Sequence, residues 1–260
     1  VPSLKMHNLM IDSSNSFPHS SGIASSASSM AAIALCITDW ERQINSEMTE
    51  ETFKIKASFL ARLGSGSASR SIYGPIASWG KTSHLKESSD RYAIPFKQKI
   101  DKIFDGFCNT IIIIDEAKKE ISSTEGHRLM NDHPFAKKRF YQANQNFSEI
   151  KNSLATGDIE KFIQIVESEA LTLHALMMTS SPPYKLFKPE TIEIIELIKN
   201  YRENSKTPLC FTLDAGPNIH FLYPKAFKKD VLDFIDNEII KIFPSIKFIH
   251  DQVGNGPKKI

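Results

Sequence analysis

The order of strand-like and helix-like segments predicts an α+β fold in two domains. Both segment types occur in each half of the 260 residues, without the regular alternation that builds a parallel sheet. A chain of this length can form one large domain or two smaller ones. A polar stretch near residues 122–130 separates a strong strand from a helical half. We therefore expect one domain over residues 1–125 and another over residues 126–260.

In the first domain, Leu4, Met6, Leu9 and Ile11 give residues 4–13 a rough strand-like pattern, which predicts a strand. Helices are expected over residues 24–40, which are rich in small side chains, and over residues 51–62. Residues 107–115 contain four consecutive isoleucines and predict a strand buried on both faces. Val1 is not a methionine and the first dozen residues resemble the inside of a domain, so we expect an N-terminal portion to be missing.

The second domain is expected to be mainly helical, with three strands toward its end. Its helices show apolar residues at three- and four-residue spacing, and its strands are short apolar runs. The expected helices cover residues 133–152, 158–178, 190–203 and 230–243, and the expected strands cover residues 208–213, 219–223 and 246–250.

Composition excludes several classes of function. The formal net charge is +2, so bulk electrostatics indicate no nucleic-acid or acidic-membrane partner. The three cysteines are far apart and show no metal-binding spacing, which is typical of reduced thiols. No apolar run is long enough to span a bilayer, and no signal-peptide pattern opens the chain. We therefore expect a cytoplasmic protein without a membrane partner.

The most informative segment is the Ser/Gly-rich stretch over residues 65–71. It combines four hydroxyls and two small flexible residues with the guanidinium of Arg70. Hydroxyls, backbone N–H groups and an arginine fork together suit a phosphate or a carboxylate. An ordinary serine-rich loop, with Arg70 in a surface ion pair, is the alternative. Nearby Arg62 better fits that surface role.

A second serine-rich segment, residues 18–29, leads directly into the first predicted helix. The start of a helix presents free N–H groups and the positive end of the helix dipole, which suit a phosphate. Ser25 and Ser26 could add hydroxyl donors or bind Mg²⁺. A serine-rich helix cap is the alternative. The Gly-Lys-Ser/Thr ending of a Walker A loop is absent.

The third segment is residues 211–218, where Asp214 follows a buried strand and precedes Ala-Gly-Pro-Asn. A carboxylate in that place could orient or deprotonate a hydroxyl. The alternative is a turn in which Asp214 or Asn218 binds nearby backbone N–H groups. Two anion sites and one acid/base carboxylate together indicate ATP-dependent phosphoryl transfer to a phosphorylated small molecule.

These three segments resemble the diphosphomevalonate decarboxylase family, within the superfamily of galactokinase, homoserine kinase and mevalonate kinase. The resemblance rests on residues 15–27, 64–74 and 214–218, and it follows nearly the whole chain in order. It implies a ribosomal-S5-domain-2-like N-terminal domain, here expected to be truncated, and a ferredoxin-like C-terminal domain, with the active site in the cleft between them. The implied substrates are ATP and mevalonate 5-diphosphate, with Mg²⁺ as cofactor, and a homodimer is implied as well.

The resemblance also implies roles for individual residues. Asp214 would act on the C3 hydroxyl and Arg70 would hold the carboxylate that leaves as CO2. The implied substrate-binding residues are Ser65, Gly66, Ser67, Ala68, Ser69, Arg70, Ser123 and Thr124. The implied nucleotide-binding residues are Ser21, Gly22, Ile23, Ala24, Ser25 and Ser26, of which Ser25 and Ser26 are candidate Mg²⁺ ligands.

The chain departs from the family pattern in four places. A Tyr-Ala-Lys-Trp-type substrate motif is absent, and residues 18–21 read Pro-His-Ser-Ser where Pro-Thr-Ala-Ala is more frequent. Ser69 stands where cysteine is common, and Thr124 stands where some relatives have arginine. Two alternatives therefore remain: a related kinase or decarboxylase that acts on mevalonate 5-phosphate or mevalonate 3,5-bisphosphate, and an inactive homologue or fragment.

Overall fold

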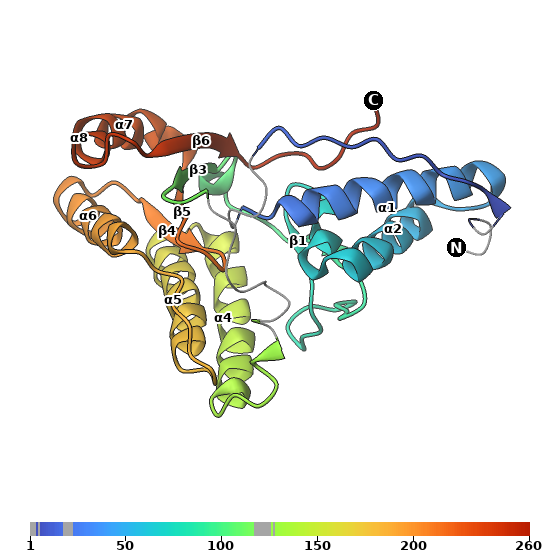
Figure 1. The fold of residues 1–260 in the computed structure, drawn as a ribbon, viewed down its shortest axis with the longest axis horizontal. Helices are drawn as coiled ribbons and strands as arrows, with labels where there is room; N and C mark the ends of the chain where they lie inside the picture. The colour runs from blue at the N-terminus through green and yellow to red at the C-terminus, as the bar shows by residue number, and fades with distance from the viewer. Residues whose placement is uncertain (1–3, 5, 18–22, 117–125, 127) are drawn as a thin grey trace. The chain divides into compact units, whose positions relative to one another are not determined.

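The computed structural model describes residues 4, 6–17, 23–116, 126 and 128–260, which form two compact units (Figure 1). The N-terminal unit comprises residues 1–19, 24–97 and 254–260, and the C-terminal unit comprises residues 20–23 and 98–253. This grouping differs from the expected boundary at residue 125. The strand over residues 108–113 pairs with strands near the end of the chain, so it belongs to the C-terminal unit.

Two antiparallel helices dominate the N-terminal unit, α1 (Ser25–Ile44) and α2 (Glu50–Gly64). Both predicted helices are confirmed, and they lie side by side in Figure 1. A 3₁₀ helix, η2 (Gly66–Ile72), forms where a loop was expected. A short hairpin of β1 (Ala77–Ser78) and β2 (Ile94–Pro95) completes the elements described in this unit.

The predicted strand over residues 4–13 is wrong. Residues 8–15 have no regular secondary structure, and the side chain of Met10 is 97% exposed. An alternating apolar pattern forms a strand only where a neighbouring strand completes its backbone hydrogen bonds. Among the described residues, none pairs with this segment.

Small side chains allow α1, α2 and η2 to approach closely. The buried cluster between them consists of Ala27, Ala31, Ala34, Ala57, Ala61, Ala68 and Ile72. The alanines recur at three- and four-residue spacing and so lie on one face of each helix. Gly64 continues this contact, because a Cβ there would lie 2.4 Å from the sulfur of Met30. The small-residue helix predicted from the sequence is therefore used for packing.

The C-terminal unit contains a four-stranded antiparallel sheet in the order β4-β5-β3-β6. Its strands are β3 (Cys108–Ile113), β4 (Cys210–Leu213), β5 (Ile219–Tyr223) and β6 (Lys247–Gln252). Helices separate β3 from β4 and β5 from β6, so the chain follows the βαββαβ pattern of ferredoxin-like folds. The predicted α+β class and the predicted strands of this half are confirmed.

The helices of this unit also match the predicted segments. Those between β3 and β4 are α4 (Ala136–Thr156), α5 (Ile159–Met178) and α6 (Pro189–Ser205). Those between β5 and β6 are α7 (Lys228–Phe234), the π-helix η5 (Ile235–Ile239) and α8 (Ile240–Ile242). The last predicted helix is thus a continuous helical run with a π-helical middle. Among the described residues, no helix is both long and apolar enough to cross a membrane.

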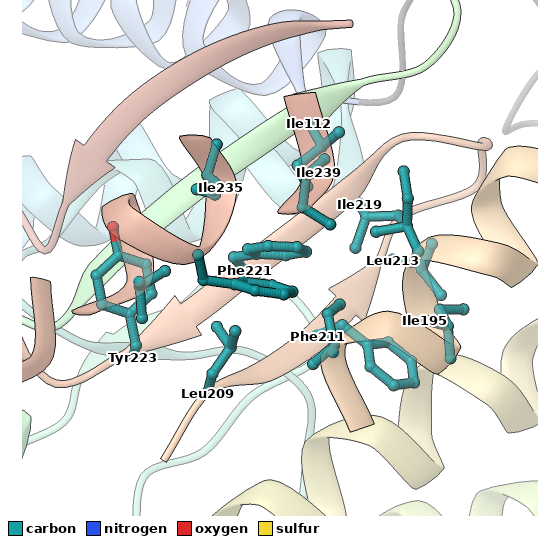
Figure 2. Packing of buried hydrophobic residues seen from close by; sticks show 14 of the residues in the cluster. Ile112, Ile195, Leu209, Phe211, Leu213, Ile219, Phe221, Tyr223, Ile235 and Ile239 are labelled. Carbon is teal, nitrogen blue, oxygen red and sulfur yellow. The ribbon is translucent and has the colours of Figure 1, made fainter. Parts of the chain in front are cut away.

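One face of the sheet forms the main core of the C-terminal unit. Ile219, Phe221 and Tyr223 alternate along β5 and are all buried. The register places Phe211 of β4 beside Phe221, and Figure 2 shows this face packed with Ile235 and Ile239 of η5. Alternate residues of a strand share one face, so this register gives the unit a continuous apolar layer. That layer fixes β4, the strand that Asp214 directly follows.

Candidate active site

The serine-rich segment after α2, residues 65–71, buries some of its residues and exposes others. Ala68 and Ser69 are fully buried, whereas Arg70 and Ser71 are exposed. Gly66 allows a close approach, since a Cβ there would lie 3.0 Å from the ring of Trp79. The segment is thus held against its own unit and presents Arg70 outward.

The buried side chain of Ser58 on α2 holds residues 65–71 in place by hydrogen bonds. Its hydroxyl donates to the carbonyl oxygen of Ser69 at 2.8 Å and accepts from the N–H of Ala93 at 2.8 Å. The hydroxyl of Ser69 donates to the carbonyl oxygen of Gly66 at 2.9 Å. Ser69, predicted to bind substrate, therefore makes its hydrogen bond within the segment.

We predict that Ser58→Ala destabilises the N-terminal unit by about 1–3 kcal/mol, because it leaves the buried N–H of Ala93 without its acceptor. The measurement is the midpoint of chemical unfolding. Ser71→Ala serves as the control, since Ser71 is exposed and makes no side-chain hydrogen bond with the described residues. Equal midpoints for the two variants would show that the Ser58 anchor contributes nothing.

The two arginines near this segment differ in their contacts. Arg70 makes no side-chain hydrogen bond or ion pair with any described residue, so its guanidinium keeps all of its donors. Arg62 instead donates to the carbonyl oxygen of Arg91 at 2.9 Å, and its guanidinium lies over the ring of Phe59. Arg62 is therefore part of the scaffold, and Arg70 can bind an anion.

The start of α1 lies beside the same segment. The hydroxyl oxygens of Ser26 and Ser65 are 3.2 Å apart, so a predicted nucleotide residue and a predicted substrate residue meet within one unit. Ser25 is buried and Ser26 is exposed. Of the two candidate Mg²⁺ ligands, Ser26 is the one with an outward hydroxyl.

The capping residue of α1 is an alanine. Ala24 occupies the N-cap position with a φ of 60° and has no polar side chain to bind the first N–H groups. Ser28 and Ser29 donate their hydroxyls to the carbonyl oxygen of Ser25 instead. Among the described residues, no side chain caps the first N–H groups of α1. The start of a helix suits an anion. Ile23 is buried, and Ser21 and Gly22 lie outside the described residues.

In the C-terminal unit, Asp214 directly follows β4 and is exposed. Its carboxylate makes no hydrogen bond or ion pair with the described part of the chain. Its backbone is held, because the Asp214 carbonyl oxygen accepts from the N–H of Gly216 at 2.7 Å and lies 3.1 Å from Nε2 of His174. An available carboxylate on a fixed backbone can act as a base or orienting group.

Asn218 closes the same loop from its other end and is 1% exposed. Its Oδ1 accepts from the N–H groups of Ile114 at 2.8 Å and Asp115 at 3.0 Å, and its Nδ2 donates to the carbonyl oxygen of Asp115 at 3.0 Å. Thr191 of α6 donates to the carbonyl oxygen of Pro217 at 2.9 Å. Asn218 thus binds backbone groups, as the turn interpretation expects, but those groups follow the distant strand β3.

Of the remaining predicted residues, Ser67 is half-buried, whereas Ser123 and Thr124 lie outside the described residues. The buried His133 accepts from the N–H of Phe135 at 3.2 Å, and its Nε2 lies 3.1 Å from the Thr179 hydroxyl oxygen. Within the described ranges, no group of three or more His, Cys, Asp or Glu side chains could hold a metal ion.

Burial raises the pKa values of three ionisable groups. Burial, with smaller contributions from Glu51 and Tyr92, raises the pKa of Tyr73 to about 12, so its hydroxyl stays protonated even in moderately alkaline solution. Burial also raises the pKa values of the Cys108 and Cys210 thiols. These thiols therefore stay protonated and are poor nucleophiles.

Comparison with known proteins identifies the family of this chain. Residues 2–93 match the family model of the diphosphomevalonate decarboxylase-like N-terminal domain. Residues 109–254 match that of the mevalonate 5-diphosphate decarboxylase C-terminal domain. The second match covers more than half of the 260 residues. The chain therefore belongs to the mevalonate 5-diphosphate decarboxylase family.

Individual relatives agree with this assignment. Diphosphomevalonate decarboxylase of Ganoderma lucidum is 27% identical over 98% of this chain and 62% of its own length. Mevalonate diphosphate decarboxylase of Staphylococcus aureus is 29% identical with a TM-score of 0.74, over 90% of this chain and 66% of its own. MDDEF in complex with MVAPP, AMPPCP and magnesium is 26% identical with a TM-score of 0.73, over 91% of this chain and 68% of its own. The chain thus spans about 62% of the length of the curated relative.

Proposed function

We propose that this protein catalyses the ATP-dependent decarboxylation of mevalonate 5-diphosphate to isopentenyl diphosphate, with release of ADP, phosphate and CO2. The observation that carries the proposal is the exposed Asp214 carboxylate on a backbone anchored by hydrogen bonds. Family membership and a relative bound to MVAPP, AMPPCP and magnesium support it. We place the reaction in the cytoplasm and in isoprenoid biosynthesis, and we propose a homodimer.

The proposed mechanism begins at the C3 hydroxyl of the substrate. Asp214 accepts the hydroxyl proton as the oxygen attacks the γ-phosphorus of ATP, and ADP leaves. The C3–O bond then breaks with its electron pair on the departing phosphate, and positive charge develops at C3. The bond to the carboxylate breaks next, its electron pair forms the alkene, and CO2 is released.

Residues of the N-terminal unit bind the charged groups in this proposal. Arg70 holds the substrate carboxylate by a bidentate contact, and Ser65 and Ser67 donate to the substrate. Ser26 and the N–H groups at the start of α1 bind the ATP phosphates. The exposed Ser26 hydroxyl would be a protein ligand of Mg²⁺, which keeps few protein ligands and, when bound, would neutralise phosphate charge.

We predict that Arg70→Gln lowers kcat/KM for mevalonate 5-diphosphate by about 10- to 100-fold, because a charge-assisted contact contributes about 1.5–3 kcal/mol. The measurement is the initial rate of CO2 release at varied substrate concentration. The KM for ATP should stay unchanged. Arg62→Gln is the control, since Arg62 is bonded within the scaffold. If the two variants have equal kcat/KM values, Arg70 does not bind the carboxylate.

A substrate panel tests the proposed function directly. The protein is incubated with ATP, Mg²⁺ and one of three compounds: mevalonate 5-diphosphate, mevalonate 5-phosphate or mevalonate 3,5-bisphosphate. The proposal expects equal amounts of ADP and CO2 with the diphosphate and slower release with the other two. Phosphorylation without CO2 would indicate a kinase. Faster turnover of another compound would identify that compound as the substrate, and no turnover would indicate an inactive homologue or fragment.

A further inference from the structure

His174 on α5 is a buried histidine that the proposed mechanism does not use. The side chain is 2% exposed, and its ring stacks on Phe187 with centroids 4.2 Å apart and planes 10° apart. Nε2 lies 3.1 Å from the backbone carbonyl oxygen of Asp214. A buried histidine therefore contacts the residue whose carboxylate is proposed to react.

The direction of this hydrogen bond follows from the partners. A carbonyl oxygen only accepts, so Nε2 of His174 must carry the proton and donate it. Stacking on Phe187 limits rotation of the ring and holds the donor toward Asp214. This hydrogen bond thus joins helix α5 to Asp214, the residue that follows strand β4.

This bond matters because the Asp214 side chain has no support of its own among the described residues. The direction of its Cβ is set by the backbone of the loop over residues 214–218. Thr191 and Asn218 fix the far end of that loop. His174 fixes the near end, at the reacting residue itself.

We propose that His174 is a positioning residue that orients the Asp214 carboxylate through the Asp214 carbonyl oxygen. This inference rests on the proposed function, in which Asp214 acts on the C3 hydroxyl. His174 transfers no proton in the reaction. Loss of the His174 hydrogen bond displaces the Asp214 carboxylate from its reactive position. A displacement of about 1 Å can lower a rate by about 100-fold.

Two variants separate positioning from packing. His174→Phe keeps a planar ring against Phe187 but removes the donor, and we expect kcat to fall about 10- to 100-fold with both KM values unchanged. His174→Gln places an amide donor near the position of Nε2, and we expect it to recover most of kcat. His133→Phe is the control, because His133 is a buried histidine of the same unit that bonds to Thr179.

The inference is overturned if His174→Phe keeps the parental kcat, or if the Gln variant is as slow as the Phe variant. A fall in kcat for His133→Phe equal to that for His174→Phe would also overturn it. Unfolding midpoints are measured alongside, and kcat is calculated per folded protein.

Failure of the proposed function has a different signature, namely no CO2 from the parent protein. In that case the inference is judged by the ¹³Cγ chemical shift of Asp214 in the parent and the variants. A shift that changes in His174→Phe and returns in His174→Gln supports the orienting bond. An unchanged shift in His174→Phe, or one that His174→Gln does not restore, overturns it.

Discussion

Asp214→Asn is expected to lower kcat for CO2 release by about 10²- to 10⁴-fold, the usual contribution of a general base. Asparagine keeps the size and polarity of the side chain but cannot accept the C3 hydroxyl proton. The unfolding midpoint should stay near that of the parent, because the carboxylate is exposed and makes no bond with the described residues. The measurement is a single-turnover assay of CO2 and ADP.

Asp236→Asn is the matched control for this prediction. Asp236 is also an exposed aspartate of the C-terminal unit without a side-chain bond among the described residues. Its substitution should leave kcat unchanged. If Asp214→Asn is as active as Asp236→Asn, Asp214 has no role as base or orienting group, and the proposed mechanism fails at its first step.

The helices and most strands could be predicted because their signals are local. The spacing of Ile159, Phe162 and Ile163 predicts one buried helix face, and α5 buries Phe162 and Ile163. Four consecutive isoleucines predict the central strand β3. The wrong strand over residues 4–13 rests on a rougher apolar pattern. A strand also needs a partner, and a single sequence does not show where the partner lies.

The residues of the candidate site likewise differ in how far the sequence predicts them. Asp214 and Arg70 could be selected from the sequence because their chemistry and neighbouring residues are unusual there, and both are exposed in the structure. Ser58, which holds the backbone of Ser69, could not be selected, because its other partner, Ala93, lies 35 positions away. Asn218 could be named from the sequence as a residue that binds backbone groups, but its partner Ile114, 104 positions away, could not. Such partners depend on the tertiary fold, and no local pattern marks them.

A partly buried ion pair links helices α5 and α6 near the start of β4. Glu167 of α5 and Arg202 of α6 form a bidentate pair with N–O distances of 2.6 Å and 3.1 Å. Their side chains are 11% and 21% exposed. Arg202 also donates to the carbonyl oxygen of Leu209 at 2.7 Å, just before β4 begins. The pair therefore joins two helices to the strand that Asp214 directly follows.

Arg202→Met is expected to destabilise the protein by about 3–5 kcal/mol, because it leaves the Glu167 carboxylate buried without its partner. Lys199→Met on the same helix is the control. Lys199 pairs with Glu196 at the surface, and loss of such a pair changes stability by less than about 1 kcal/mol. Chemical unfolding followed by circular dichroism measures both variants.

A second substitution separates an unpaired charge from lost packing. If the buried charge is the cause, Arg202→Met combined with Glu167→Leu should be more stable than Arg202→Met alone, because the double variant removes both charges. If packing of the arginine stem is the cause, the second substitution should restore nothing. An Arg202→Met midpoint equal to that of Lys199→Met would contradict the prediction. In that case the pair would not hold β4, and the backbone of Asp214 would depend on the core strands and on His174.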